Sequence, residues 1–403
     1  MYSSIKDYKL IFNTQNSKFS GQNLADMFVD FNIYESIFQP FVTAKLTIID
    51  THDLVYRGPI VGDEEIEITA VDNDDKIFNW NFVVYKLERD NNAKQGQVSK
   101  QLLILYLITK EEKNNILKRI SRRLEDLPHN LVSHVVEKYL DGNIIDLESK
   151  FTDKIPLTAN YWKPLEIINY IEEQTVDCLF YQNQLGFHFR SVADLMNTEF
   201  VEKLTWKQPS DTTFKVSDII SYSMQKYFNL KELGMTFQGL GTTNYRFDDI
   251  EYKWYKEQND FESVSEYTTN LGKKLDIPTS WKTYNSEVKR VYNDEVTENR
   301  RKLLNRLFDK YKLTLRINGK KERNIGENYL IEYFIRERET SDKININLTG
   351  FWFLVSVRHH FLKSGEYNQV MNLVKNGFNS YSYKNIPDQI GTNRVYSGEN
   401  FTK

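Results

Sequence analysis

The histidines have the clearest potential for metal or acid–base chemistry in this sequence. His359 and His360 are adjacent in a stretch of strand-like alternation, and adjacent side chains of a strand point to opposite faces. The pair therefore favours a structural role over shared metal ligation. His129 and His134 lie five residues apart, a poor spacing for two ligands on one helix, and no second histidine of a zinc-protease helix follows His134. We expect no metal site at either place.

Three other motifs are weak candidates for chemistry. Cys178 is the single cysteine, so an intrachain disulfide is excluded, and its apolar neighbours predict a small buried residue. Gly239-Leu240-Gly241 lacks the third glycine and the strand–helix context of a dinucleotide-binding loop. The basic run Arg300-Arg301-Lys302 lies in a predicted helix of a chain with a net charge of −3. This favours an exposed face or a contact with an acidic partner over nucleic-acid binding.

An acidic run opens one of the predicted strands, and its members are Asp63, Glu64, Glu65 and Glu67. A glycosidase requires two carboxyl groups that face each other across a cleft, and near-consecutive positions at a strand start do not supply that geometry. A solvated sheet edge is the simple interpretation. Since triad, paired-acid and metal spacings are all missing, the sequence predicts no catalytic, cofactor-binding or metal residues. We therefore expect that the protein is not an enzyme.

The element that positions the two adjacent histidines is an antiparallel hairpin predicted over residues 348–374. Apolar residues recur at alternate positions, which are Phe351, Phe353, Val355 and Val357. We expect these side chains to face a core. The turn is Lys363-Ser364-Gly365-Glu366, where the glycine permits a positive φ.

A weaker copy of this region lies near the N-terminus. An apolar residue, a glycine and an acid open a strand at residues 61–63, and a hairpin beginning Phe-x-Val follows at Phe82. The same order recurs at residues 325–327 and at Phe353. The similarity is either chance or an internal repeat, and a repeat matches Gly62 with Gly326. It predicts that residues 5–110 and a set centred on 312–375 fold as the same antiparallel barrel.

The chain between these regions changes periodicity. Residues 1–110 are predicted to form the first barrel, with strands at Lys9–Phe12, Phe28–Phe38 and Phe41–Asp50 and a corner at Pro40. Helical spacing then marks a small α+β module over residues 111–205. Its predicted elements are helices at Glu111–Leu124 and Leu131–Leu140, a helix starting at Pro164 with a buried stripe at Ile167, Ile168 and Ile171, and a hairpin over residues 179–190.

The remaining chain returns to β character before a helix. The clearest strands are Ile219–Phe228 and Tyr245–Trp254, and Ser286 can cap a long helix over Glu287–Lys310. The predicted divisions are a β-rich inserted module with part of the second barrel at 206–285, the helix and second barrel at 286–375, and a C-terminal tail at 376–403. The fold class is α+β and mainly β: two tube-like antiparallel β-barrels, a small α+β module between them and a further small β insertion.

Composition supports β-rich folding and excludes several classes. The chain has 403 residues, enough for two to four domains, and 25 Tyr and 25 Phe within a hydrophobic fraction of 40%. Near-neutral charge gives no global signal for nucleic-acid binding. No apolar run approaches the roughly 18 residues of a membrane span, and the N-terminus lacks the apolar core of a signal peptide. We expect a soluble protein folded in a reducing cytoplasm.

Four segments resemble the central baseplate hub proteins of contractile-tailed bacteriophages, which are related to the hub domains of secretion-system spike proteins. They are residues 41–50 (FVTAKLTIID), 59–66 (PIVGDEEI), 162–171 (WKPLEIINYI) and 353–361 (FLVSVRHHF), in the order of that family. The resemblance covers most of residues 28–375. It rests on structural patterns and not on catalytic motifs, and no needle-like β-helix repeat follows Lys375.

The resemblance implies a homotrimer in which six barrels form a pseudo-six-fold ring. This ring adapts a six-fold tail tube protein to a three-fold central spike protein and leaves a channel through which DNA passes without specific binding. Further implied partners are the tape-measure protein and inner baseplate proteins, and the implied location is the baseplate of the virion, assembled in the bacterial cytoplasm. The acidic run could then line the channel and repel DNA phosphates.

A different class of function also fits an aromatic-rich β protein. The alternative is a carbohydrate-active or receptor-binding tail protein, because β domains rich in aromatic residues often bind glycans. Oligomeric form separates the two: a hub forms a trimeric ring with a channel, whereas a glycosidase needs a cleft with paired acids.

Overall fold

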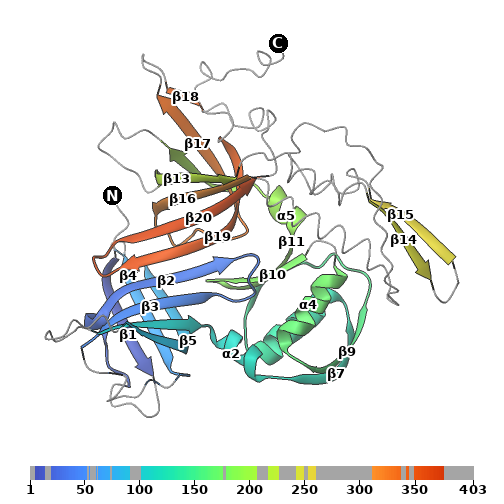
Figure 1. Cartoon of the computed structure of the whole chain (residues 1–403), viewed down its shortest axis with the longest axis horizontal. Helices are drawn as coiled ribbons and strands as arrows, with labels where there is room; N and C mark the ends of the chain where they lie inside the picture. Colours follow the sequence, from blue (N-terminus) through green and yellow to red (C-terminus); the bar gives the residue numbers. More distant parts are fainter. Residues whose placement is uncertain are drawn as a thin grey trace.

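A computed structural model gives the arrangement of the chain, and strands predominate among its elements (Figure 1). The residues that it describes are 5–13, 20–51, 54, 60, 62–72, 75–90, 101–175, 178–206, 217–226, 242–248, 253–259, 311–336, 342–344 and 349–375. Within these ranges, no helix is long and apolar enough to cross a membrane.

The first half of the main sheet comes from the N-terminal part of the chain. Its strands are β1 (Ile5–Asn13), β2 (Phe28–Ser36), β3 (Thr43–Asp50), β4 (Glu65–Asp72), β5 (Ile77–Asp90) and β6 (Gln101–Ile108), with a short helix η1 (Ala25–Met27) before β2. They lie in the order β1-β4-β5-β6-β3-β2, and neighbours are antiparallel. Ala44, Leu46 and Ile48, alternate residues of β3, are buried as a strand requires. The predicted strands before and after Pro40 are confirmed.

The second half comes from the C-terminal part. Its strands are β12 (Phe200–Trp206), β13 (Ile219–Lys226), β16 (Tyr311–Asn318), β17 (Asn328–Arg336), β18 (Asp342–Ile344), β19 (Gly350–Leu362) and β20 (Tyr367–Lys375). The predicted hairpin is confirmed: β19 and β20 are antiparallel, and Gly365 in the turn has a φ of 88°. Residues Trp352 to Val355 are buried on both faces of β19, whereas alternation predicted one buried face. Side chains of the small module, among them Leu179 and Leu195, join the core around this stretch.

The predicted repeat is present in the order of the strands. In the first half, neighbouring strands follow the order β2-β3-β6-β5-β4. In the second half, they follow the order β13-β16-β20-β19-β17. In both, the five strands taken in chain order occupy the positions first, second, fifth, fourth and third. Pairing of β2 with β19 joins the halves into one 13-stranded sheet.

The mainly β, α+β class is confirmed, but two closed barrels are not. Among the described residues, β1 approaches the start of β2 only through the single bridge Ile11↔Asn23. In the second half, β12 approaches the start of β13 only through Thr205↔Asp218. Each half therefore curls so that its ends meet at one point, without a continuous ladder there.

The small module lies beside the first half (Figure 1). It contains α2 (Lys110–Leu117), β7 (Ile120–Asp126), α3 (Pro128–Val135), η2 (Val136–Leu140), β8 (Ile144–Leu147), β9 (Ile155–Trp162), α4 (Pro164–Gln174), β10 (Cys178–Asn183), β11 (Gly186–Ser191) and α5 (Val192–Asn197). The predicted helix over Glu111–Leu124 is wrong beyond Leu117, where β7 pairs with β9. Ile120 and Leu124 are the buried residues of β7, and a spacing of four fits a strand as well as a helix. The helix starting at Pro164 and its buried isoleucines are confirmed.

Two further predictions on the inserted regions can be placed. The single strand predicted over Tyr245–Trp254 is wrong, because β14 (Thr242–Asp248) and β15 (Lys253–Asn259) form a hairpin there. The helix predicted over Glu287–Lys310, with its basic run, lies outside the described residues. So do Gly239-Leu240-Gly241 and the tail at 376–403.

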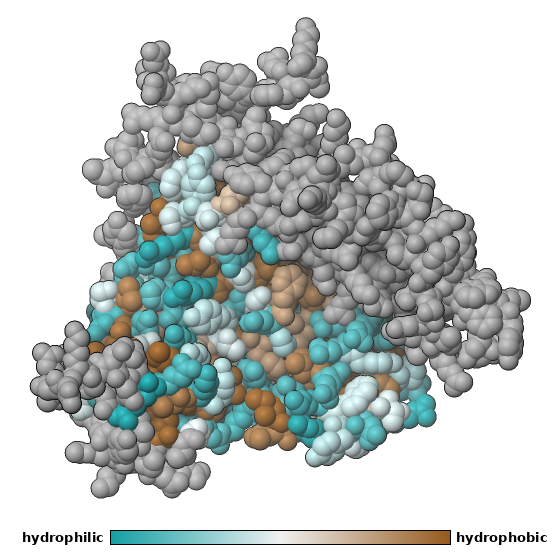
Figure 2. Space-filling view, in the orientation of Figure 1, coloured by the Kyte–Doolittle hydropathy of each residue, from teal (hydrophilic) through white to brown (hydrophobic). Residues whose placement is uncertain are grey.

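The cores show that the two halves are not independent. The first core contains residues of β1 to β6, but also Phe361 and Tyr367 from the ends of β19 and β20. The rings of Phe361 and Tyr367 stack with centroids 4.2 Å apart, and Phe78 meets Tyr367 edge to face. The tip of the C-terminal hairpin thus completes the first half. On the face shown in Figure 2, hydrophobic and hydrophilic residues are interspersed over the described part.

Candidate functional site

The candidate site is the join between the halves, which is the pairing of β2 with β19. A bulge in each half shows which residues of the two halves correspond. β5 shifts its register against β6 after Val84, and β19 shifts its register against β20 after Leu354. A bulge adds one residue to one strand and is a specific feature of the ladder. Val84 therefore corresponds to Leu354. The predicted match of Phe82 with Phe353 is one residue out, because the counterpart of Phe353 is Val83.

A second pair of bulges lies in β2 of the first half and in β13 of the second half. β2 shifts its register against β3 between Phe28 and Asp30. β13 does the same against β16 between Ile219 and Ser221. These coincidences make β13 the counterpart of β2 and β19 the counterpart of β5, with residue-level register.

The corner before β4 matches the corner before β17. The N–H of Asp63 donates to the carbonyl of Val84 (2.8 Å), and the N–H of Gly326 donates to the carbonyl of Leu354 (2.9 Å). Both residues have a positive φ, 79° for Asp63 and 82° for Gly326. Asp63 is thus the counterpart of Gly326, and the predicted match of Gly62 with Gly326 is also one residue out.

The room available for a side chain explains why only one of these two corners needs glycine. A Cβ on Gly326 would lie 2.6 Å from the Tyr181 hydroxyl oxygen of the small module. Asp63 is at an exposed corner, where its carboxylate forms an ion pair with Lys113 of α2. A short polar side chain tolerates the left-handed conformation, so Asp63 can occupy a position that only Gly can fill in the second half.

The join itself is an antiparallel ladder between β2 and β19. It runs from the pair Asp30↔Leu362 to the pair Ser36↔Ser356. Just beyond it, the N–H of Ile37 donates to the carbonyl of Val355 (3.0 Å), the residue at the bulge of β19. β2 is therefore an inner strand of the joined sheet and presents no open edge there.

A buried polar cluster lies at this ladder, centred on His359. Its Nδ1 lies 2.8 Å from the Tyr367 hydroxyl and 3.2 Å from the Gln369 amide, and its Nε2 lies 3.1 Å from the Gln184 amide. The carboxylate of Glu35 lies 3.5 Å from Nε2, and both side chains are fully buried. Burial raises the pKa of Tyr367 far above its ordinary value, so the hydroxyl stays neutral. Paired buried groups of this kind favour a single register of β2 against β19.

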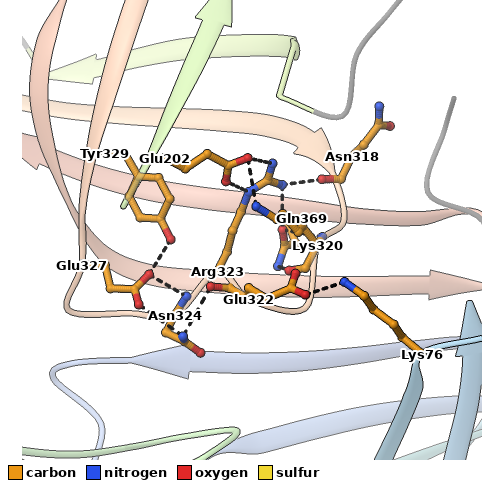
Figure 3. A network of polar contacts seen from close by, with 10 residues as sticks. All are labelled: Lys76, Glu202, Asn318, Lys320, Glu322, Arg323, Asn324, Glu327, Tyr329 and Gln369. Atoms are coloured by element: carbon orange, nitrogen blue, oxygen red, sulfur yellow. Dashed lines mark hydrogen bonds and ion pairs between the residues drawn. The ribbon is translucent and has the colours of Figure 1, made fainter. Parts of the chain in front are cut away.

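Gln369 connects this cluster to a second one around Arg323 (Figure 3). Arg323 is 1% exposed and donates from Nε and Nη2 to the two carboxylate oxygens of Glu202 on β12, at 2.8 and 3.2 Å. Its Nη1 donates to the Asn318 carbonyl and to the Gln369 amide oxygen (3.0 Å). The fork geometry of guanidinium suits this bidentate contact. Arg323 thus ties three strands of the second half to the join.

The turn between β16 and β17 also touches the first half directly. Lys76 forms an ion pair with Glu322 at 2.5 Å, as Figure 3 shows. Lys321 donates to the carbonyl of Ile77 (2.7 Å), and its ammonium lies 5.3 Å from the centre of the Phe78 ring. These contacts fix the orientation of the halves at a second place.

Two strand edges have no neighbouring strand within the described part of the chain. Among the described strands, none pairs with β5 beyond Val83 on the side away from β6. None of them forms a ladder with β13 on the side away from β16. Their counterparts, in β19 and β2, pair with each other.

The structure shows where the histidines and the cysteine singled out in the sequence lie. His359 is fully buried while its neighbour His360 is half-buried, as opposite faces of a strand require. Burial lowers the pKa of His360, and the nearby Arg358 lowers it further. Cys178 is buried, as its apolar neighbours predicted. Within the described ranges, no three His, Cys, Asp or Glu residues gather as metal ligands.

The predicted acidic run does not act as one cluster. Glu64 is buried, and its carboxylate accepts a hydrogen bond from the N–H of Gly62 (3.0 Å). Asp63 pairs with Lys113 at an exposed corner, Glu65 is exposed and Glu67 is half-buried. Glu65 and Glu67 are two residues apart in β4 and lie on one face of the strand, while the buried Glu64 precedes the strand.

Sequence reasoning missed the two buried polar clusters. Glu35 interrupts an apolar and aromatic strand, and that signal was available. The pairing of Arg323 with Glu202 had no signal, because the two residues are separated by 121 positions and meet only through the sheet.

Comparison with known proteins identifies the fold. No protein-family model and no curated protein matches the chain. Among solved structures, a tail protein from Neisseria meningitidis MC58 superposes with a TM-score of 0.54 at 11% identity, over 92% of this chain and 97% of that chain. The 43 kDa tail protein of prophage MuSo2 from Shewanella oneidensis gives 0.55 at 10% identity, over 91% and 98%. This chain has the fold of these phage tail proteins.

Proposed function

We propose that this chain is a structural subunit of a phage tail and forms the baseplate hub. Three copies form a ring in which six similar half-sheets surround a channel. The observation that carries the proposal is the in-chain repeat: two halves with one strand order and matching bulges are already joined edge to edge by β2 and β19. A closed ring is built by repeating such a contact. The fold shared with phage tail proteins supports the same conclusion.

The proposal assigns two tube-like barrels to the halves, within residues 1–110 and 206–375. One side of the ring binds a six-fold tube protein, and the other side binds a three-fold spike. DNA passes through without specific binding, and a tape-measure protein and inner baseplate proteins are further partners. The location is the baseplate of a phage tail or of a related injection machine, assembled in the host cytoplasm. The role is architectural and needs no enzymatic activity.

The carbohydrate-binding alternative has a weaker basis in the described surface. Trp206, Tyr222 and Tyr333 gather at β12, β13 and β17. Their rings contact one another, with the Tyr222 and Tyr333 hydroxyls 2.5 Å apart, instead of forming an open stacking platform.

Native mass measurement at micromolar concentration, followed by negative-stain imaging, tests the proposal. We expect a trimer and ring-shaped particles with a central hole, and a position on the tail axis in assembled particles. A dimer or a tetramer, or a particle with this chain away from the axis, would contradict it. Cleavage of a glycan or of peptidoglycan that one carboxylate substitution abolishes would favour the enzymatic alternative.

A further inference from the structure

Among the described strands, the two edges without a neighbouring strand are counterparts of the two edges that form the join. β13 corresponds to β2 through their matching bulges, and β5 corresponds to β19 in the same way. Within one chain, β2 and β19 pair. The described part of each chain therefore contains one join, β2 with β19, and the two edges that an equivalent second join would use.

Exposure at the open edge of β5 shows what the missing strand would cover. Tyr85 is 53% exposed, whereas its counterpart Val355 is 8% exposed. Leu87 is half-buried, whereas its counterpart Val357 is 2% exposed. Helix α2 contacts β5 near the bulge, where Lys113 reaches Asp63, and the stretch beyond it remains open. An edge of this kind has N–H and carbonyl groups available for another strand.

We propose that β13 of one copy pairs, in antiparallel orientation, with the C-terminal half of β5 of a second copy. The contact repeats between chains the β2–β19 join that exists within each chain. This inference rests on the proposed ring, since three in-chain joins and three between-chain joins of the same geometry close a circle of six half-sheets. The two edges differ from each other, so the contact is heterologous and closes only as a ring.

The in-chain ladder predicts the register of this contact. In the join, Asn32 of β2 pairs with His360 of β19. Counting from the matched bulges, Ser223 is the counterpart of Asn32, and Asp90 is the counterpart of His360. Ser223 of one copy should therefore lie opposite Asp90 of the next. Residues directly opposite in an antiparallel ladder have Cα atoms about 4.5–5.5 Å apart, within the range that a disulfide spans.

Disulfide trapping tests this register with the full-length chain. One preparation carries Ser223→Cys and a second, of different mass, carries Asp90→Cys; the two are mixed and oxidised. We expect a mixed disulfide-linked dimer. Chains carrying Lys86→Cys in place of Asp90→Cys are the matched control, because that residue lies on the same edge but about 13 Å away along the strand. They should give no mixed dimer. Native Cys178 is buried and stays in all variants.

An in-chain pair shows that the oxidation conditions suffice. Ser36 and Ser356 are opposite each other in the existing join, so Ser36→Cys with Ser356→Cys should form a disulfide within one chain. Failure of the Ser223–Asp90 pair under conditions that oxidise this control overturns the proposal, whether the protein is then a monomer or a trimer built through other surfaces. Equal trapping of the Lys86 control overturns the register.

A single chain that carries both Ser223→Cys and Asp90→Cys separates this inference from the proposed function. Covalent products that end at a trimer support both the strand pairing and the ring. Efficient trapping with products that continue past three chains supports the pairing but contradicts the trimeric hub. A native trimer without trapping supports the hub and contradicts the pairing.

Discussion

The two halves of the sheet agree in the five strands that carry the join and differ in the strand that flanks them. Bulges recur at the same places in β5 and β19 and in β2 and β13. The flanking strand is antiparallel in the first half, where β1 pairs with β4, and parallel in the second, where β12 pairs with β17. The bulge positions are therefore the same in the strands that meet a second half-sheet. The direction of the flanking strand differs, because β12 enters the sheet from the small module.

The largest effect is expected at the core of the second half. Phe353→Ala removes a ring that is 2% exposed and should lower the free energy of unfolding by about 3–5 kcal/mol. Val83→Ala, at its counterpart, removes a smaller side chain that is 3% exposed and should cost about 2 kcal/mol. Chemical denaturation at pH 7 measures both. Equal losses, or an unchanged Phe353 variant, would contradict the residue correspondence or the burial.

The next effect distinguishes the two corners. Gly326→Ala places a Cβ against the Tyr181 hydroxyl in a left-handed conformation and should cost about 2–3 kcal/mol. Asp63→Gly relieves the same conformation but loses the ion pair with Lys113, so its effect should be within about 1 kcal/mol.

A rescue variant identifies the cause at Gly326. Adding Tyr181→Phe removes the hydroxyl oxygen, the nearest atom to the new Cβ, and should recover the steric part of the loss but not the conformational part. No recovery would mean that backbone strain alone explains the effect.

The sequence predicts elements whose signals are local. The turn at Gly365 and the alternation of the two strands around it were sufficient for the hairpin of β19 and β20. The same reasoning failed at Ile120–Asp126, because a spacing of four fits both periodicities. The repeat was detected through glycine, but matching Gly62 with Gly326 was one residue wrong, since the N–H that bonds the Val84 carbonyl belongs to Asp63. Backbone hydrogen bonds, and not residue identity, define the correspondence.

The candidate site could not be predicted in the same way. The join pairs residues more than 300 positions apart, and nothing in β2 or β19 alone indicates its partner. An open strand edge cannot be predicted from the sequence either, because a strand has the same sequence whether its neighbour belongs to its own chain or to another copy. Only the comparison of the halves shows that, among the described strands, β13 and β5 lack the neighbour that β2 and β19 have.

A buried lysine at the end of β20 should limit stability near neutral pH. Burial lowers the pKa of Lys375 to about 8, so below that pH the folded state carries a poorly solvated charge. Its Nζ donates to the Thr349 carbonyl (3.2 Å) and lies 5.6 Å from the Trp352 ring centre, which offsets part of the cost. Lys375→Met should therefore stabilise the protein by about 1–2 kcal/mol at pH 7.

The pH dependence supplies the control for this prediction. The penalty is fully present below the folded-state pKa of about 8 and disappears as pH rises toward the ordinary value of 10.5. The advantage of Lys375→Met should thus shrink between these values. Lys363→Met removes an exposed lysine that also donates to a carbonyl, that of Asp26, and should show no such trend. An advantage of Lys375→Met that is constant with pH would point to packing instead of charge.

The smallest effect concerns the ion pair that links the halves outside the sheet. The side chains of Lys76 and Glu322 are each 50% exposed, and exposed pairs couple by only about 0.2–1 kcal/mol. A double-mutant cycle with Lys76→Met and Glu322→Gln measures this coupling from denaturation curves. The hydrogen bond from Lys76 lowers the pKa of Glu322, so the coupling should persist at neutral pH and vanish only when acid protonates the carboxylate below its ordinary range. It should also weaken in molar salt. A coupling above about 2 kcal/mol that resists salt would mean that this turn, and not the β2–β19 ladder alone, holds the two halves together.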